Sequence, residues 1–431
     1  MKNTTLPPLT VETIVNGGAG LARHEGRVVF IPHTAVGDVV NSRVIKVKKN
    51  FLEAELSEIL QPSTLRRQPL CPVAGDCGGC QWQHLPYSEQ LCWKEKLFRE
   101  TLIRHCGIDT AKILPIHPAA DEWNYRSRVQ IKCCNTSTGF KTGFYRPKSH
   151  NVVSIEQCPI IASVLNLLLT QFRNIINRTS HASHIPQVDL AVDDNNKCSA
   201  VIHYSGHDSA ALGELLSSGS LSADLFIKTG AKNKVINIHG DGVLEIAVDA
   251  PPIKLRYAVG GFSQINLGQN RNLVEAVLSL AELTGCEHAL DLYCGMGNFS
   301  LPLAQHCIKI IGVEESTVSI RMARENKRNN HIDNVEFYNQ SAEGALSYFI
   351  KENPIDILLL DPPRSGASAI TKELLEFPVK KVIYISCDPQ TLSRDLKLLV
   401  NGGYELVSSQ PFDMFPQTHH CESITLLQYI F

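Results

Sequence analysis

Three cysteines lie close enough in this sequence for their thiols to meet at one point. Cys71, Cys77 and Cys80 are separated by five residues and by two, and glycine and proline are frequent between them. A tight loop of this kind can present three thiolates to a metal. A fourth ligand is required, and four thiolates fit a zinc ion and a [4Fe–4S] cluster equally well by count.

A second set of reactive side chains lies in the last third of the chain. Glu314, Asp361 and Cys387 each stand at the end of a mostly apolar run that is predicted to form a strand. In a parallel sheet the carboxyl ends of the strands face one crevice, so side chains far apart in sequence converge there. A thiol in such a crevice is a candidate nucleophile.

The elements that position this second set alternate regularly from residue 288 onward. Alternating strands and helices predict a doubly wound, largely parallel sheet. The predicted strands span residues 289–293, 308–313, 335–338, 355–360 and 382–386, and the predicted helices span 298–306, 316–330, 341–351, 368–376 and 389–400. Residues 405–409 and 423–430 are predicted to add further strands.

The first predicted strand of this sheet runs into a loop with two glycines. Gly295 and Gly297 follow Asp291, and glycines let the backbone approach a ligand at the mouth of the next helix. Glu314 comes 19 positions after Gly295, where a carboxylate can reach a pair of ribose hydroxyls. The spacing would also suit a dinucleotide, but the third glycine of a dinucleotide fingerprint is absent.

The front of the chain has a different pattern. Short strands separated by turns are predicted between residues 10 and 60, and alternating apolar and basic residues over 42–49 indicate a half-buried strand with a cationic face. A small β-barrel of the oligonucleotide-binding (OB) type is the expected fold. Residues 91–103 have helical spacing, and residues 110–255 indicate a mixed α/β region.

Three domains are therefore expected. They are a β-barrel over residues 1–62, a central α/β domain with the cysteine loop over 63–254, and a C-terminal Rossmann-like domain over 255–431. Residues 1–160 hold 20 lysines and arginines against 14 acidic residues, whereas the remainder holds 21 against 29. A basic front half suits a polyanion, although unevenly charged solvated surfaces would give the same counts.

The sequence also bears on the compartment. No segment has the run of about 18 apolar residues that a membrane span needs, and the first residues lack the apolar core of a secretory signal. We therefore expect a cytoplasmic protein without membrane attachment. Because cytosolic thiols stay reduced, the 14 cysteines predict metal binding or catalysis at some positions rather than a disulfide framework.

Four segments together resemble the RNA uracil-C5 methyltransferase family. They are Gly261-Phe262-Ser263-Gln264-Ile265-Asn266, Asp361-Pro362-Pro363-Arg364, Ser386-Cys387-Asp388-Pro389 and His420-Cys421-Glu422-Ser423. This resemblance covers residues from about 255 to 431. At the front, Gly17-Gly18-Ala19-Gly20-Leu21-Ala22-Arg23 looks like the small RNA-binding barrel, called TRAM, that many members carry.

The resemblance implies an enzyme that transfers a methyl group from S-adenosylmethionine to C5 of a uridine. Uracil C5 is a poor nucleophile, and a thiolate that adds to C6 supplies the missing electron density. The resemblance gives this role to Cys387 and makes Glu422 the base that removes the C5 proton. A buried cysteine with a purely structural role is the alternative for Cys387.

The resemblance also implies cofactor contacts. Asp361 is expected between cofactor and uracil, and Arg364 is expected either to steady the enolate oxygen or to pair with phosphate. Ser341 stands where the family usually has an acidic or amide residue against adenine, so this contact departs from the family pattern. The other positions that match cofactor contacts are Gln264, Tyr293, Asn298 and Glu314.

By the same resemblance, Cys158 is the fourth cysteine ligand, and the set favours a [4Fe–4S] cluster over zinc. RNA is expected to be held by basic and aromatic side chains of the front half, with the target base flipped out of its stack. These side chains are Lys46, Lys48, Lys49, Arg126, Arg128, Lys132, Lys141, Arg146 and Lys148, with Trp123, Tyr125, Phe140, Phe144 and Tyr145.

The barrel and the cysteine loop most resemble the large-subunit ribosomal RNA enzymes, which predicts a uridine of 23S rRNA as the target and a monomeric enzyme. The T-loop of tRNA is the alternative target for the same chemistry. Two other classes of function remain to be weighed. Cys387 and Glu422 disfavour an inactive RNA-binding protein, and the absent third glycine and the barrel disfavour a nicotinamide-dependent oxidoreductase with an iron–sulfur centre.

Overall fold

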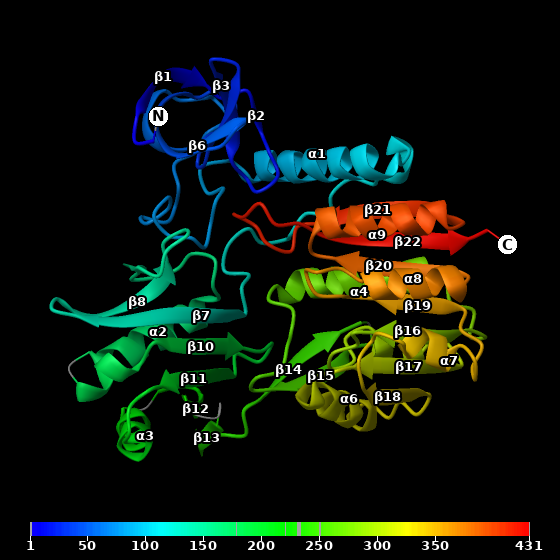
Figure 1. Cartoon of the computed structure of the whole chain (residues 1–431). Coiled ribbons are helices and arrows are strands. Elements are labelled where there is room, and N and C mark those ends of the chain that lie inside the picture. The colour runs from blue at the N-terminus through cyan, green and yellow to red at the C-terminus, as the bar shows by residue number, and fades with distance from the viewer. Residues whose placement is uncertain (1, 178, 220, 231–233, 250, 431) are drawn as a thin grey trace.

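The computed structural model describes residues 2–177, 179–219, 221–230, 234–249 and 251–430. Three large sheets organise the described chain, and Figure 1 shows them as a small barrel, a central α/β body and a C-terminal α/β body. Among the described helices, none combines the length and the apolar character that crossing a membrane requires.

The first sheet forms the expected small barrel. Its six strands are ordered β1-β5-β6-β4-β3-β2 and surround an apolar core that includes the fully buried Val29, Ile31, Val40 and Val44. The strands are β1 (Thr5–Thr10), β2 (Thr13–Ile14), β3 (Gly20–His24), β4 (Arg27–Ile31), β5 (Val39–Val47) and β6 (Phe51–Gln61).

The central sheet has seven strands in the order β13-β12-β11-β10-β7-β8-β9, and α2 (Ser163–Ile176) and α3 (Ser209–Ser218) pack against it. All its strand pairs are antiparallel except β11 with β12. The strands are β7 (Arg128–Thr136), β8 (Gly139–Tyr145), β9 (Val152–Ser154), β10 (Gln187–Val192), β11 (Cys198–Tyr204), β12 (Asp224–Thr229) and β13 (Lys234–His239).

The C-terminal sheet has the predicted alternation of strands and helices. Its order is β18-β17-β16-β19-β20-β22-β21, and the first five strands are parallel. The strands are β16 (His288–Leu292), β17 (Lys309–Glu314), β18 (Val335–Asn339), β19 (Ile357–Leu360), β20 (Lys381–Ser386), β21 (Tyr404–Phe412) and β22 (Glu422–Tyr429). The helices are α4 (Leu267–Ala281), α5 (Ser300–Ala304), α6 (Thr317–Asn329), α7 (Ala345–Phe349), α8 (Ser368–Glu376) and α9 (Pro389–Asn401).

Strand β22 breaks the parallel pattern because it lies between β20 and β21 and is antiparallel to both. Its first residues therefore lie at the same edge of the sheet as the carboxyl ends of the parallel strands. The segment that ends β21 and the segment that begins β22 both face the ligand crevice of this fold.

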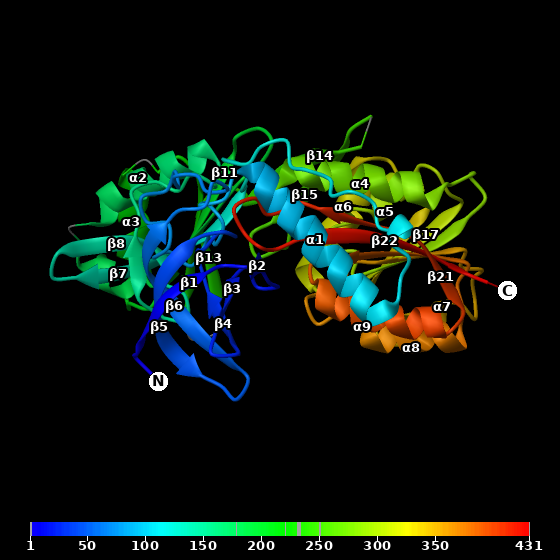
Figure 2. The same cartoon turned by 90° about the horizontal axis from the view of Figure 1, so that it is seen from above.

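Helix α1 (Tyr87–Cys106) includes the predicted helix over 91–103 and packs on the C-terminal body rather than on the central sheet. Phe98 and Leu102 share a core with Leu396 and Leu399 of α9. Figure 2 shows α1 lying across the C-terminal body beside α9 and β21. Because α1 follows the barrel and the cysteine loop in the chain, its packing connects them to the sheet that carries the predicted catalytic residues.

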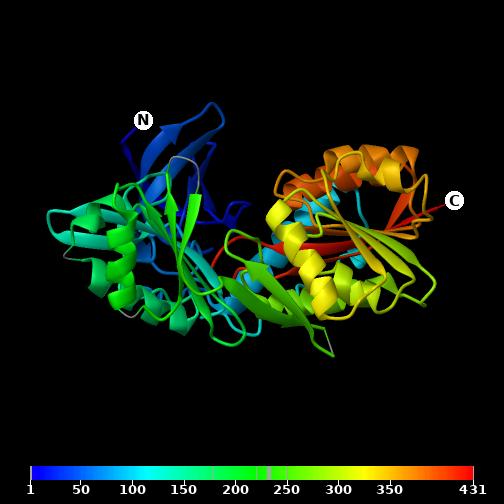
Figure 3. The same cartoon turned by 90° about the horizontal axis from the view of Figure 1, so that it is seen from below.

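The hairpin of β14 (Val243–Val248) and β15 (Ile253–Ala258) leads from the central sheet into the C-terminal body. It packs with α4 and α6 in the same apolar core. Figure 3 shows this hairpin alongside α6, and the Glu245 N–H donates to the Asp193 carboxylate over 3.1 Å, which joins the hairpin to the residues that follow β10. The short 3-10 helices η1 (Thr110–Lys112) and η2 (Ser180–His184) complete the elements of the described residues. The domain boundaries at residues 62 and 254 stay a prediction.

Candidate active site

The predicted nucleophile and the predicted base lie on neighbouring strands. Ser386 of β20 pairs with Ser423 of β22, and the Ser423 hydroxyl donates to the Ser386 carbonyl over 3.1 Å. Cys387 and Glu422 are the next residues outward on the two strands. The structure therefore brings together the two residues to which the resemblance gave the chemistry.

Burial is the largest cause of the pKa shift of both groups. Cys387 is partly exposed, and burial raises the pKa of its thiol to about 12, with the Glu422 charge as the next cause. Glu422 is 4% exposed, and its pKa is raised well above the usual value, first by burial and then by the Asp361 charge. The Arg364 guanidinium opposes both shifts, so the charges of Asp361 and Arg364 act on both Cys387 and Glu422 in one crevice.

Three carboxylates stand at the carboxyl ends of adjacent strands. Burial raises the pKa of Asp361, directly after β19, to about 7. Asp291 of β16 is fully buried and accepts a hydrogen bond from the Ser300 hydroxyl. Burial, with smaller contributions from the charges of Asp361 and Glu314, raises its pKa to about 8. Like charges gathered in this way favour a bound cation, which would relieve their repulsion.

The glycine loop after β16 has the backbone conformation that a close approach to a ligand requires. Tyr293, Gly295 and Gly297 have positive φ angles of 68°, 58° and 92°. The Glu314 carboxylate accepts the Gly295 N–H over 3.2 Å and the Ser316 N–H over 2.7 Å. Glu314 is thereby fixed beside the loop, at the place predicted for a ribose contact.

The other predicted cofactor residues differ in how firmly the structure connects them to this crevice. Asn298 exchanges two side-chain hydrogen bonds of 2.9 Å with Asn270 of α4, which fixes its amide. Gln264 is partly exposed, and its neighbour Ile265 is held by Ser127. Ser341 follows β18 and is exposed, and its hydroxyl accepts the Glu343 N–H over 3.3 Å. Among the described residues, no hydrogen bond joins Ser341 to the three carboxylates.

The four predicted ligand cysteines line one cavity of about 460 Å³. All four are free thiols, and burial raises the pKa of Cys80 to about 12 and that of Cys158 to about 11, with neighbouring cysteines contributing in each case. Within the described residues, no three His, Cys, Asp or Glu side chains meet closely enough to hold a metal ion. The same cavity is lined by Phe262, Ser263 and Ile265, which flank Gln264.

Comparison with known proteins gives the family. A family model described as tRNA (Uracil-5-)-methyltransferase matches residues 87–430, and a TRAM domain model matches residues 7–57. The chain belongs to the uracil-C5 RNA methyltransferase family. Its barrel is a TRAM domain, and its C-terminal body has the Rossmann-like methyltransferase fold.

Curated relatives match over nearly the whole chain. A protein of Legionella pneumophila (strain Paris), named 23S rRNA (uracil(1939)-C(5))-methyltransferase RlmD, is 32% identical over 99% of this chain and 98% of its own. The RlmD of Aeromonas hydrophila is 31% identical with the same coverage. A solved structure of Pyrococcus abyssi tRNA (uracil-54, C5)-methyltransferase with S-adenosyl-L-homocysteine covers 97% of this chain and 99% of its own at 23% identity, with a TM-score of 0.78, which shows a shared fold.

The structure corrects part of the predicted RNA surface of this methyltransferase. Tyr125 and Phe140 are buried in the central core, and the Tyr125 hydroxyl donates to the Pro416 carbonyl over 3.0 Å, so neither ring is free to stack on a base. Tyr145 stays partly exposed with Lys132 at 5.4 Å from its ring centre. The interleaved pattern therefore mixed core positions with surface positions. Phe140 and Tyr145 lie on β8, where alternate residues face opposite sides, and Tyr125 precedes β7.

Three residues that connect α1 to the catalytic strands were missed by the sequence analysis. Lys94 and Asp413 form an ion pair of 2.5 Å with both side chains fully buried, and Gln417 is also fully buried. One signal was available, because Lys94 shares a helical face with Leu97 and Phe98. A lysine in register with core positions indicates a buried partner.

Proposed function

We propose that this enzyme transfers a methyl group from S-adenosylmethionine to C5 of a uridine in 23S rRNA. The observation that carries the proposal is the side-by-side placement of Cys387 and Glu422 at the mouth of the crevice, beside Asp361 and Arg364. The curated relatives named for 23S rRNA, which match almost from end to end, support ribosomal RNA as the substrate class.

Each of these crevice residues has a separate role in the proposed reaction. Cys387 Sγ loses its proton to solvent as it bonds to C6 of the uracil, and Arg364 stabilises the enolate oxygen that results. Bound S-adenosylmethionine supplies an electrophilic methyl group, which C5 accepts. Glu422 then takes the C5 proton, the C5–C6 double bond reforms, and the Sγ–C6 bond breaks to free the thiolate.

The raised pKa values fit these roles. A thiol whose pKa is near 12 is protonated in the free enzyme, and a thiolate made beside the enolate-stabilising Arg364 is a strong nucleophile. A carboxylate whose pKa is raised by burial is a stronger base than an exposed one, which suits Glu422 for proton removal from carbon.

The residues present suit the cofactor. Glu314, oriented by two backbone N–H groups, would bind the ribose hydroxyls, and the carboxylates Asp291 and Asp361 provide the negative surroundings that a sulfonium needs. By their match to the family, we also assign cofactor contacts to Gln264, Tyr293, Asn298 and Ser341.

We further infer that Cys71, Cys77, Cys80 and Cys158 hold a [4Fe–4S] cluster. The four free thiols line one cavity, and neighbouring cysteines act on the Cys80 and Cys158 thiols. Four thiolates can bind a [4Fe–4S] cluster, and the match to the family favours a cluster over zinc. When bound, the cluster would tie the cysteine loop to the central sheet.

The test compares the wild-type enzyme with Cys387→Ala. Wild-type enzyme is expected to methylate 23S rRNA transcripts, and mapping 5-methyluridine identifies the nucleotide. Cys387→Ala is expected to retain S-adenosylmethionine binding and lose all turnover. Methylation of tRNA in place of rRNA would reassign the substrate, and methylation by Cys387→Ala would overturn the role of the thiol.

A further inference from the structure

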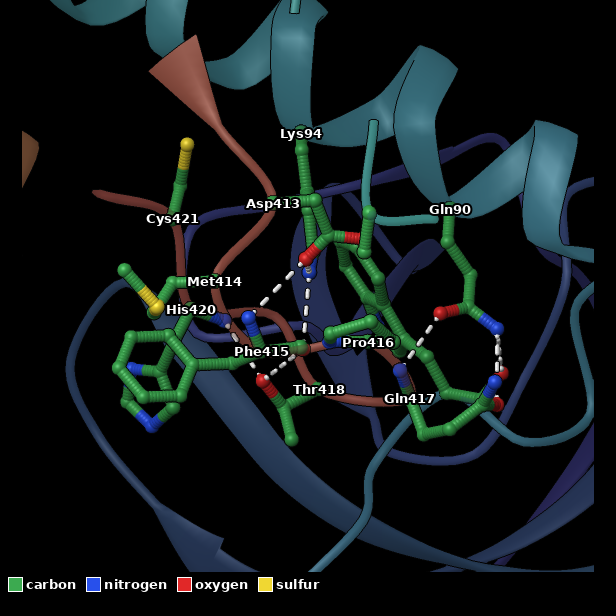
Figure 4. Close-up of polar contacts among 12 residues, drawn as sticks. Gln90, Lys94, Asp413, Met414, Phe415, Pro416, Gln417, Thr418, His420 and Cys421 are labelled. Atoms are coloured by element: carbon green, nitrogen blue, oxygen red, sulfur yellow. Dashed lines mark hydrogen bonds and ion pairs between the residues drawn. The ribbon is translucent and has the colours of Figure 1, made fainter. Parts of the chain in front are cut away.

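The loop between β21 and β22, residues 413–421, leads directly into the proposed base. Phe412 and Glu422 pair across its mouth, so the loop is closed at the residue whose carboxylate does the chemistry. Figure 4 shows this loop beneath α1, with Lys94 and Gln90 reaching down from the helix towards Asp413 and Gln417.

The Glu422 side chain has little to orient it apart from this loop. Among the described residues, its carboxylate accepts no hydrogen bond, although the side chain is only 4% exposed. The direction of the carboxylate therefore depends on the backbone at the start of β22, together with the Asp361 and Arg364 charges that act on it. That backbone depends on how the nine loop residues before it are held.

The first part of the loop is held by Lys94. Its ammonium donates to the Asp413 carboxylate over 2.5 Å and to the Phe415 carbonyl over 3.0 Å, and the same Asp413 oxygen accepts the Phe415 N–H over 3.2 Å. The Thr418 hydroxyl donates to the Phe415 carbonyl and accepts the His420 N–H. The hydrogen-bonded part of the loop therefore extends to two residues before Glu422.

The middle of the loop is held by the backbone of Gln417. Its N–H donates to the Gln90 side chain over 2.8 Å, and its carbonyl accepts the N–H groups of Gln81 and Trp82 over 3.1 and 3.0 Å. Gln417 has a φ of 70°, a left-handed conformation that a non-glycine residue adopts at a cost. These bonds from α1 and from the segment after Cys80 maintain that conformation.

The Gln417 side chain bonds in three further directions. Its carbonyl oxygen accepts from Arg67 over 2.9 Å and from Gln90 over 3.0 Å, and its amide nitrogen donates to the Glu122 carboxylate over 3.0 Å. One buried residue thus joins the segment after the barrel, helix α1 and the entry to the central sheet. No other residue of the loop makes side-chain bonds to so many separate segments among those described.

We propose that Gln417 is a positioning residue for Glu422: its contacts hold the 413–421 loop so that the carboxylate points at the C5 proton. This inference rests on the proposed function. Glu422 acts only after the Sγ–C6 bond has formed and the methyl group has moved. Loosening the loop therefore slows proton removal and expulsion of Cys387, and leaves the earlier steps intact.

The experiment uses Gln417→Leu, which keeps the buried volume and removes every side-chain hydrogen bond. The readout is the methylated RNA held covalently through Cys387, seen as a slowly migrating band on a denaturing gel, together with S-adenosylmethionine affinity. We expect unchanged cofactor affinity and one methyl group transferred per enzyme before the RNA is released. We expect release of the RNA to be slowed by about tenfold or more, which is a part of the roughly hundredfold or greater effect of a general base. Gln410→Ala is the matched control, because Gln410 also bonds a distant carbonyl, that of Pro115, but from within β21.

Gln417→Gly provides a second variant in case the leucine disturbs folding, because glycine adopts the positive φ freely. Accumulated methylated adduct with either variant, and none with Gln410→Ala, supports the positioning role. Normal release in both variants overturns it while leaving the proposed function standing. Parallel losses of cofactor affinity and adduct formation also overturn it, since they mark a general structural defect. Absence of methylation by the wild-type enzyme overturns both proposals.

Discussion

At the scale of single residues, the crevice is defined by groups whose charged forms are disfavoured by burial. Asp361 and Asp291 have pKa values raised to about 7 and about 8, and the Cys387 thiol has a pKa raised to about 12. A cation among these groups stabilises their ionised forms. The free enzyme therefore holds protons that a sulfonium would displace.

Proton release on cofactor binding follows from the Asp361 pKa. At pH near 7 Asp361 is partly protonated, and a bound sulfonium lowers its pKa, so binding of S-adenosylmethionine should release protons. The affinity should fall as the pH falls below about 7, because the neutral carboxyl attracts the cation less. Calorimetry in buffers of different ionisation enthalpy measures the protons released.

S-adenosylhomocysteine serves as the control for this linkage, since its thioether is uncharged. It should release fewer protons than S-adenosylmethionine and show a flatter dependence of affinity on pH. Asp361→Asn should reduce the difference between the two ligands in the number of protons released. Equal proton release by both ligands with the wild-type enzyme would contradict the assignment of Asp361 to the sulfonium.

A second prediction at this scale distinguishes the roles proposed for Cys387 and Glu422. Glu422→Gln leaves Cys387 able to bond to C6 but removes the acceptor of the C5 proton, so the methylated RNA should stay attached to the enzyme. A denaturing gel with labelled methyl groups measures this adduct. If Glu422→Gln turned over at the wild-type rate without an adduct, another group would have to be the base.

At the scale of elements, α1 stabilises the catalytic strands through a buried charge pair. Lys94 and Asp413 are both inaccessible to solvent, and each compensates the charge of the other. Removing one partner of such a pair leaves a buried charge unpaired, whereas removing both is tolerated far better. The helix therefore depends on its partner loop for stability, as the loop depends on the helix for its shape.

Lys94→Met should destabilise the fold by about 3–5 kcal/mol, because the Asp413 carboxylate loses its only ionic partner among the described residues. Lys94→Met combined with Asp413→Asn should recover most of that loss. Denaturant unfolding followed by tryptophan fluorescence reports on this region through Trp82 and Trp93. Equal destabilisation of the single and the double variant would show that charge burial is not the cause.

The elements also show what could be predicted from the sequence. The alternation from residue 288 onward predicted the strands and helices that follow this residue, since short buried strands and amphipathic helices differ in period, whereas α4 and the hairpin of β14 and β15 were not predicted. The insertion of β22 between β20 and β21 was not predictable, because periodicity gives no strand order. Residues 110–255 gave no topology, as their antiparallel strands are joined by loops of irregular length.

Site prediction was limited in the same way. Cys387 and Glu422 were assigned by resemblance, and the register of β20 with β22 supplies the physical reason for their proximity. Gln417 could not have been found from sequence, because its partners Arg67, Gln90 and Glu122 lie about 300 residues or more away along the chain. Only the folded chain brings them together.

At the scale of the whole molecule, the TRAM domain contacts α1 and the segment before it through the turn between β2 and β3 and through an apolar cluster that includes Ala35. The Trp82 indole donates to the Gly18 carbonyl over 3.0 Å, and the Asn16 amide donates to the Thr101 hydroxyl of α1 over 3.2 Å. A side chain at Gly18 would meet His419 at 2.9 Å, three residues before Glu422. The barrel is thus docked against the wall of the crevice.

Gly18→Ala should disturb this docking, and Gly17→Ala should not. Both glycines have positive φ angles, of 83° and 92°, so both variants carry the same backbone strain. Only at Gly18 does the added methyl group clash with His419 and Trp82. We expect an additional destabilisation of about 1–3 kcal/mol from this overpacking, and weaker RNA binding, measured by thermal unfolding and fluorescence anisotropy. Identical behaviour of the two variants would show that this turn is not a rigid contact.

The position of β22 in its sheet affects the order in which this enzyme folds during synthesis. Protein chains are made from the amino terminus, so β22 is synthesised after every other strand of its sheet and must insert between β20 and β21, which already exist. A partly made chain holds Cys387 with no carboxylate opposite it. Competence to complete a cycle on RNA therefore begins only when β22 has been inserted.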